Sequence, residues 1–150
     1  MAKLKLKDPW DQCKKCLPAT CCTYFALQVD EPETRKDYEA MLWQIAHRGV
    51  SFYIYRKGWY MMVETVCNFL RDDNKCAIYE TRPYICKEHS IENCEYTGGD
   101  YGFNEHFKSY KELLDWINEN TNFRFKYKEP DYGKPSAKGQ KLKAMVGCGS

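Results

Sequence analysis

Residues 50 to 66 run Val50-Ser-Phe-Tyr-Ile-Tyr-Arg-Lys-Gly-Trp-Tyr-Met-Met-Val-Glu-Thr-Val66, and this stretch decides the fold. Its first part alternates Val, Phe and Ile with Ser and Tyr, a period of two residues that is typical of a β-strand. Gly58 closes a short turn, and the residues after it again favour a strand. The stretch therefore predicts a β-hairpin.

Elements of both kinds are predicted on the N-terminal side of this hairpin. Tyr24-Phe-Ala-Leu-Gln-Val29 is short, apolar and aromatic, as strands are. A helix is predicted over residues 31–47, because Asp30 and Glu33 have the spacing of a capping box and Pro32 suits a first turn. The inward side chains of this helix recur at helical spacing: Tyr38, Met41, Leu42, Ile45 and Ala46.

A second helix is predicted on the C-terminal side, over residues 110–120. Ser109 and Glu112 form another capping-box pair at its start, and the inward residues are Leu113, Leu114 and Ile117. Phe123-Arg-Phe-Lys-Tyr127 has the alternation of a last strand. Together these elements predict an α+β fold, with a small antiparallel sheet, helices packed on it and a metal-binding cysteine cluster at one end.

A chain of 150 residues is long enough to bury a core and has the size of one domain. We expect residues 1–125 to form a single cysteine-cluster metal-binding domain. From Lys126 onward six lysines face only Glu129 and Asp131, and Pro and Gly are frequent. Residues 126–150 are therefore expected to be a basic, flexible tail.

Composition predicts a cytoplasmic protein. The start, Met1-Ala-Lys-Leu-Lys-Leu-Lys-Asp8, lacks the unbroken apolar stretch of a signal peptide, and no apolar run is long enough to cross a bilayer. Cytoplasmic thiols are kept reduced, so cysteine patterns there indicate metal sites. The net charge is +2 with its excess in the tail, and we expect neither a membrane nor a nucleic acid as partner.

Nine cysteines are more than ordinary use requires, and eight of them fall in two groups. The ninth, Cys148, lies in a Gly-Cys-Gly tail and is expected to be a free thiol. His89 is an alternative imidazole ligand, and for Cys94 the competing interpretation is a buried packing residue. The predicted metal ligands are Cys13, Cys16, Cys21, Cys22, Cys67, Cys76, Cys86 and Cys94.

The spacing of these cysteines does not fit two familiar templates. A zinc ribbon would supply a second Cys-x-x-Cys, and the closely spaced ferredoxin run is missing. Cys21 and Cys22 are adjacent, so either they lie in a turn or their sulfurs bind different metal atoms. Eight thiols exceed the four that one zinc takes, which favours an iron-sulfur cluster of the 4Fe-4S type, with zinc as the alternative.

Three motifs carry a family resemblance. Cys13-x2-Cys16-x4-Cys21-Cys22 is followed by Cys67-x-Phe69-Leu70 and by Cys76-x-Ile-Tyr-x-x-Arg-Pro-x-x-Cys86. The set resembles the bacterial and archaeal CxxCxxCC family of zinc- or iron-chelating domains (YkgJ type), which is related to flagellin lysine N-methylases. The resemblance covers residues 13–94 and implies metal binding by Cys13, Cys16, Cys21, Cys22, Cys67, Cys76 and Cys86.

Two departures from the family pattern are visible. Four residues separate Cys16 from Cys21 where the family usually has two or three, and Lys87 stands where an arginine often follows. The longer loop bears on how Cys21 and Cys22 are arranged around a metal.

The sequence predicts a metal-binding protein whose iron-sulfur centre serves electron transfer, or which acts as an accessory or maturation factor of a larger redox system with a protein partner. No Ser/His/Asp grouping, HExxH or dinucleotide fingerprint points to catalysis. Two alternatives remain, a protein-lysine methyltransferase-like enzyme and a zinc-stabilised interaction module. Arg82 is the candidate cofactor-binding residue, through a hydrogen bond to cluster sulfur; otherwise it caps a carbonyl or pairs with Glu80 or Asp72.

Overall fold

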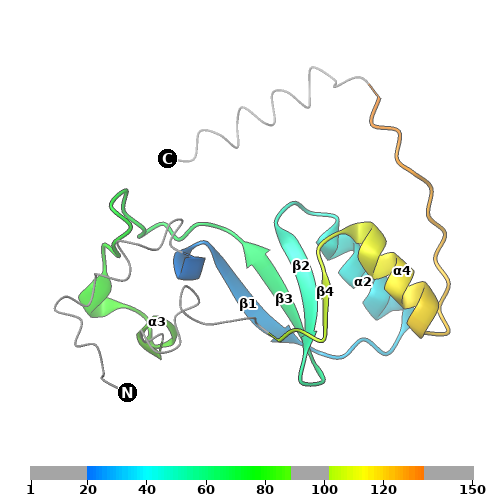
Figure 1. Cartoon of the computed structure of the whole chain (residues 1–150), viewed down its shortest axis with the longest axis horizontal. Helices are drawn as coiled ribbons and strands as arrows, with labels where there is room; N and C mark the ends of the chain where they lie inside the picture. The colour runs from blue at the N-terminus through cyan, green and yellow to red at the C-terminus, as the bar shows by residue number, and fades with distance from the viewer. Residues whose placement is uncertain (1–19, 89–101, 134–150) are drawn as a thin grey trace.

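A computed structural model describes residues 20–88 and 102–133 of the chain. The elements follow the order strand, helix, hairpin, helix, strand and helix (Figure 1). The strands are β1 (Tyr24–Val29), β2 (Val50–Tyr55), β3 (Gly58–Glu64) and β4 (Glu105–Phe107), and the helices are α2 (Arg35–Ile45), α3 (Tyr84–Glu88) and α4 (Tyr110–Asn120). Short 3-10 turns are η1 (Thr20–Cys22) and η2 (Tyr79–Thr81).

The four strands form one antiparallel sheet in the order β1-β3-β2-β4. The hairpin predicted over residues 50–66 is confirmed, with Tyr55 opposite Gly58 at its turn. The strand predicted at residues 24–29 is also confirmed and pairs with β3. The α+β prediction therefore holds.

The fourth strand is not the one that the sequence predicted. β4 pairs with β2, with Phe107 opposite Phe52, whereas the described part of the chain has no strand at residues 123–127. The prediction failed because the Asn118 side chain satisfies the backbone there: its amide oxygen accepts from Phe125 N–H at 2.7 Å, and its NH2 donates to Phe125 C=O at 3.0 Å. The segment is held against α4 without a sheet neighbour.

Helix α2 begins four residues later than predicted. Its capping box joins Thr34 and Asp37 and not Asp30 and Glu33: Thr34 Oγ1 accepts from Asp37 N–H at 3.2 Å, and Asp37 Oδ2 accepts from Thr34 N–H at 2.8 Å. The hydrogen bonds that Thr34 and Glu33 donate to the Asp37 carboxyl lower its pKa. The helix begins here because Thr34 and Asp37 make both bonds of the capping box. Helix α4 is capped by Ser109, as predicted.

The core lies between one face of the sheet and the helices α2 and α4, which pack side by side (Figure 1). Phe52, Leu113 and Ile117 are fully buried at its centre. The opposite face carries an aromatic stack, in which the Tyr53 ring lies 5.0 Å from Tyr60 and 4.3 Å from Phe103. The remaining buried core side chains are Tyr38, Met41, Leu42, Ile45, Trp59, Phe107 and Leu114.

Gly49, at the entry to β2, provides a test of the hairpin. Its φ is +83°, and a Cβ at this position would lie 3.0 Å from the Glu64 carbonyl oxygen. We expect Gly49→Ala to lower the free energy of unfolding by about 2–3 kcal/mol, because the left-handed backbone and the contact both cost energy. Gly102, with φ +63° and nothing near its missing Cβ, is the matched control. Urea unfolding should show a smaller loss for Gly102→Ala, and equal losses would contradict the contact with Glu64.

Candidate metal centre

The described cysteines lie beyond the end of the sheet, away from α2 and α4 (Figure 1). We call residues 20–23 and 65–88 the cysteine lobe. Among its described side chains none is buried, since every buried core residue belongs to the sheet and helices. Val66, Tyr84 and Ile85 are more than 60% exposed. The apolar core therefore does not hold this lobe together.

Backbone hydrogen bonds continue the pairing of β1 and β3 into the lobe. Thr65 N–H donates to the Thr23 carbonyl at 2.9 Å, and Cys67 N–H donates to the Cys22 carbonyl at 2.7 Å. The 3-10 turn η1 ends at Cys22, so Cys21 and Cys22 lie in a tight turn. This is the first of the two arrangements that the adjacent pair allowed. The register of the sheet thus joins the two cysteine groups of the sequence.

A short hairpin follows Cys67 and carries Cys76 on its returning arm. Leu70 pairs with Cys76 in an isolated antiparallel bridge, and Ala77 N–H donates to the Phe69 carbonyl at 2.8 Å. The reversal is made by residues 71–75, where Asn74 adopts φ +61°. Cys67 and Cys76 therefore stand near the two ends of one small hairpin.

Arg82 lies between Cys76 and Cys86 and is fixed by Tyr79. Its Nε donates to the Tyr79 carbonyl at 2.8 Å, and its guanidinium carbon lies 3.7 Å from the centre of the Tyr79 ring. Of the roles that the sequence left open, capping a carbonyl is the one observed. Cys86 follows in α3, where its N–H donates to the Pro83 carbonyl at 3.0 Å. The sequence analysis missed Tyr79 as the partner, although three-residue spacing in a helical turn is its signal.

The pKa of the Cys22 thiol responds to cysteines of both sequence groups. The Cys21 thiol hydrogen-bonds to the Cys22 sulfur and lowers the pKa of Cys22, against the opposing effect of burial. Negative charge on Cys67, Cys76 and Cys86 also acts on Cys22 and raises its pKa. Cysteines from both sequence groups are therefore close enough to influence one another. Thiolates at short range repel one another, and a cation relieves that repulsion.

The donor set matches a soft metal. The five described cysteines are thiols and not disulfides, and thiolate is the ligand that zinc and iron-sulfur clusters take. In residues 20–88 and 102–133, no three Cys, His, Asp or Glu side chains are close enough to enclose one ion as they stand. The residues present therefore fit a metal by chemistry and shared environment.

The remaining predicted ligands lie outside the described residues. These are Cys13, Cys16 and Cys94, together with the alternative ligand His89 and the expected free thiol Cys148. The assignment of these residues stays a prediction.

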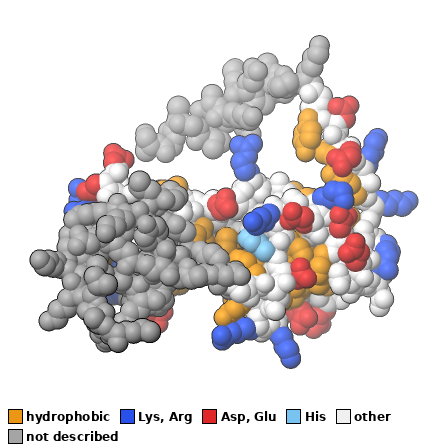
Figure 2. Space-filling model, viewed as in Figure 1, with side chains coloured by type: hydrophobic (Ala, Val, Ile, Leu, Met, Phe, Trp, Pro, Cys, Tyr) orange, Lys and Arg blue, Asp and Glu red, His pale blue; other side chains and the backbone are white. Residues whose placement is uncertain are grey.

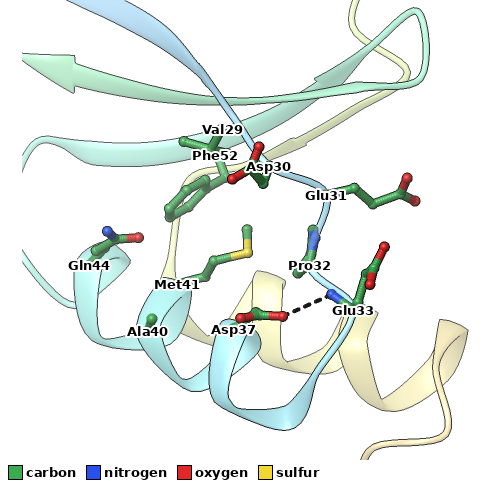
Figure 3. A pocket seen from close by; sticks show the side chains of 10 residues that line it. All are labelled: Val29, Asp30, Glu31, Pro32, Glu33, Asp37, Ala40, Met41, Gln44 and Phe52. Atoms are coloured by element: carbon green, nitrogen blue, oxygen red, sulfur yellow. Dashed lines mark hydrogen bonds between the residues drawn. The ribbon is translucent and has the colours of Figure 1, made fainter.

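A second candidate location is the hollow between β1 and α2 shown in Figure 3. Its floor is apolar, with Val29, Met41 and Phe52, and carboxylates stand at its rim. Asp37 is already occupied, because it accepts the Glu33 and Thr34 amides in the capping box. The hollow therefore offers no set of free ligands comparable to the thiols.

Surface charge does not form a single-sign patch in the view of Figure 2, where acidic and basic side chains are interspersed around the helices. The short ion pairs are local, such as Arg35 with Glu39 at 3.1 Å. This face therefore lacks the continuous basic stripe typical of nucleic-acid binding.

None of the helices within residues 20–88 and 102–133 has the length and apolar character needed to cross a bilayer.

A family model matches residues 12–113, which is more than half of the chain; its description is "CxxCxxCC: Putative zinc- or iron-chelating domain". No curated protein matches the chain. No solved structure matches it either. The matched range contains the whole described cysteine lobe.

Proposed function

Since the chain belongs to the CxxCxxCC family of zinc- or iron-chelating domains, we propose that its cysteine lobe holds a thiolate-ligated iron-sulfur centre and that the protein serves electron transfer or the maturation of a larger redox system. The described residues that would hold the centre are Cys21, Cys22, Cys67, Cys76 and Cys86. When bound, the cluster supplies one-electron chemistry that no protein side chain here provides.

The main support for metal binding is the difference in burial between the sheet with its helices and the cysteine lobe. The sheet and helices enclose a buried core, whereas the cysteine lobe has five cysteines and no buried side chain among its described residues. A segment with so little apolar burial usually needs a disulfide or a metal to stay folded. The five described cysteines form no disulfide, and a metal bound by thiolates is the stabilising element that we propose.

The number of thiols supports iron over a single zinc. One structural zinc takes four ligands, and five cysteines are already present in the described part of the chain. The adjacent pair Cys21 and Cys22 does not itself favour a site with several metal atoms, because adjacent cysteines in a 3-10 turn do not require two metal atoms. The preference for iron now rests on thiol number alone.

Arg82 is proposed as a positioning residue of this centre. Its guanidinium is held by the Tyr79 ring and carbonyl, beside the segment that carries Cys86. A fixed positive charge near thiolates favours the ionised form of the thiols. With a cluster bound, it favours the reduced state, which carries more negative charge. Arg82→Lys keeps the positive charge but loses the planar stacking on Tyr79. This variant therefore separates the effect of the charge from the effect of the stacking.

Exposed apolar side chains in the lobe support a protein partner. Val66, Tyr84 and Ile85 are 62%, 75% and 73% exposed, and all three come from the cysteine lobe. Large apolar groups left in water near a redox site are typical of a docking surface. We propose that the partner docks beside the metal centre.

The test is elemental analysis of protein purified without oxygen. We expect iron and acid-labile sulfide in about equal amounts per chain, with a brown colour and broad visible absorption that bleaches on reduction. Cys148→Ser should give the same values. A colourless protein with stoichiometric zinc would overturn the iron-sulfur proposal and favour the zinc-stabilised module.

A further inference from the structure

The two edges of the sheet differ in how they are protected. β4, at one edge, spans only Glu105–Phe107 and carries a charged residue, both of which discourage pairing with another chain. β1, at the other edge, is six residues long, Tyr-Phe-Ala-Leu-Gln-Val, and has no charge and no proline. By the usual rules for soluble proteins, β1 is an unprotected edge.

The outward backbone groups of β1 follow from the register. Thr65 N–H donates to the Thr23 carbonyl, and Thr23 stands opposite Thr65 when the pairing of Tyr24 with Glu64 is extended by one residue. Bonded pairs alternate along an antiparallel ladder, so Phe25, Leu27 and Val29 bond to β3. The N–H and C=O groups of Tyr24, Ala26 and Gln28 therefore point away from the sheet. In the described chain no strand lies beyond them.

Two side chains of β1 remain half exposed on the face that the helices cover elsewhere. Phe25 is 50% and Leu27 is 42% exposed, although their neighbours on β3, Val63 and Met61, are partly buried. The helices pack over β2, β3 and β4 and leave this part of the face uncovered. Within the part of the chain that the structure describes, this edge therefore has backbone groups without a strand partner next to exposed apolar side chains.

We propose that β1 is the interface of a homodimer, in which β1 of a second copy pairs with it antiparallel about a two-fold axis at Ala26. In this register Tyr24 lies opposite Gln28 of the second copy, so every outward N–H and C=O finds a partner. Phe25 lies opposite Leu27 of the second copy, and these side chains close into one apolar cluster. The result is a continuous sheet with the helices of both copies on the same face.

A second copy fits this edge in one register. With Ala26 opposite Ala26 of the second copy, all three outward residues pair, and a shift of two residues in either direction leaves outward groups unpaired. Because β1 is uncharged, two copies meet without like-charge repulsion. The acidic residues Asp30, Glu31 and Glu33 lie after the strand and outside the paired region.

The test is sedimentation of the metal-loaded full chain over a range of concentrations, under reducing conditions without oxygen. We expect a reversible dimer. Ala26→Pro removes an outward N–H and leaves the bonds to β3 in place, so it should weaken the dimer about tenfold or more. Leu27→Arg should abolish the dimer by placing a charge in the apolar cluster. Trp43→Arg is the matched control, because Trp43 is 67% exposed on α2, and its dimer should be unchanged.

Hydrogen exchange identifies the occupant of the edge. In the dimer, the amides of Tyr24, Ala26 and Gln28 should exchange more slowly as concentration rises. A chain that stays monomeric at high concentration would overturn the proposal. In that case a slow Ala26 amide would assign the edge to another segment of the same chain, and a fast one would leave it open to a different protein. Equal dimer strength in Ala26→Pro, Leu27→Arg and the parent would also overturn it.

Discussion

Replacing Cys22, Cys67 or Cys76 by serine is expected to remove about half or more of the bound metal per chain, because serine is a poor substitute for a soft thiolate. The structure selects these three, since Cys67 N–H donates to the Cys22 carbonyl and Cys76 lies in the short hairpin that follows, opposite Leu70. Cys13, Cys16, Cys21 and Cys86 are expected to behave in the same way. Metal and sulfide per chain, measured without oxygen, give the answer.

Two controls accompany the cysteine series. Cys148→Ser should keep full metal, and Cys94→Ser should fall between the two groups. Fluorescence of Trp59 and Trp116, which contact each other in the core at 5.3 Å, should be unchanged in every variant, because the core does not include the lobe. Full metal in most of the first seven variants would refute a single shared site and favour packing cysteines.

Metal removal is expected to unfold the cysteine lobe and to leave the sheet and helices folded. The lobe has no buried side chain among its described residues, so metal binding supplies most of its folding free energy. Crowded thiolates would also repel one another without a cation. We expect the amides of Cys67, Arg71 and Ala77, which are hydrogen-bonded in the lobe, to lose protection from exchange by about a hundredfold or more.

Amides of the core provide the comparison within the same sample. Phe52, which is fully buried, should change by less than about tenfold after chelation of the metal. Unchanged protection in the lobe would show that metal does not hold it. Equal losses in both regions would show that lobe and core unfold as one unit, which the separate packing argues against.

The sequence pattern predicted strands and helices correctly where a segment had a clear period of two residues or a clear helical spacing. The hairpin at β2 and β3, strand β1 and helix α4 were predicted close to their observed bounds, because alternation and helical spacing act within a few residues. The start of α2 was wrong, since the sequence offers two capping-box pairs and the structure forms the box at Thr34 and Asp37. The strand predicted at residues 123–127 was wrong because a side chain, Asn118, met its backbone needs.

Part of the candidate site was also visible before the structure. The cysteine motifs identified the family, since residue spacing is a property of the chain itself, and the thiol ligands stay a prediction. The role of Arg82 at the site also stays a prediction, and its contact with Tyr79 was missed because the stacking depends on the turn that η2 makes.

The sequence alone determined the α+β class, the hairpin, the two long helices and the family, because these depend on composition, short-range periodicity and residue spacing. Tertiary structure alone decided that Cys67 bonds to Cys22 across the sheet register, that β4 completes the sheet beside β2, and that β1 lies at the edge of the sheet that the described residues form. Each of these depends on contacts between segments far apart in the chain. Strand register and loop closure are set by such contacts and cannot be predicted from short stretches of sequence.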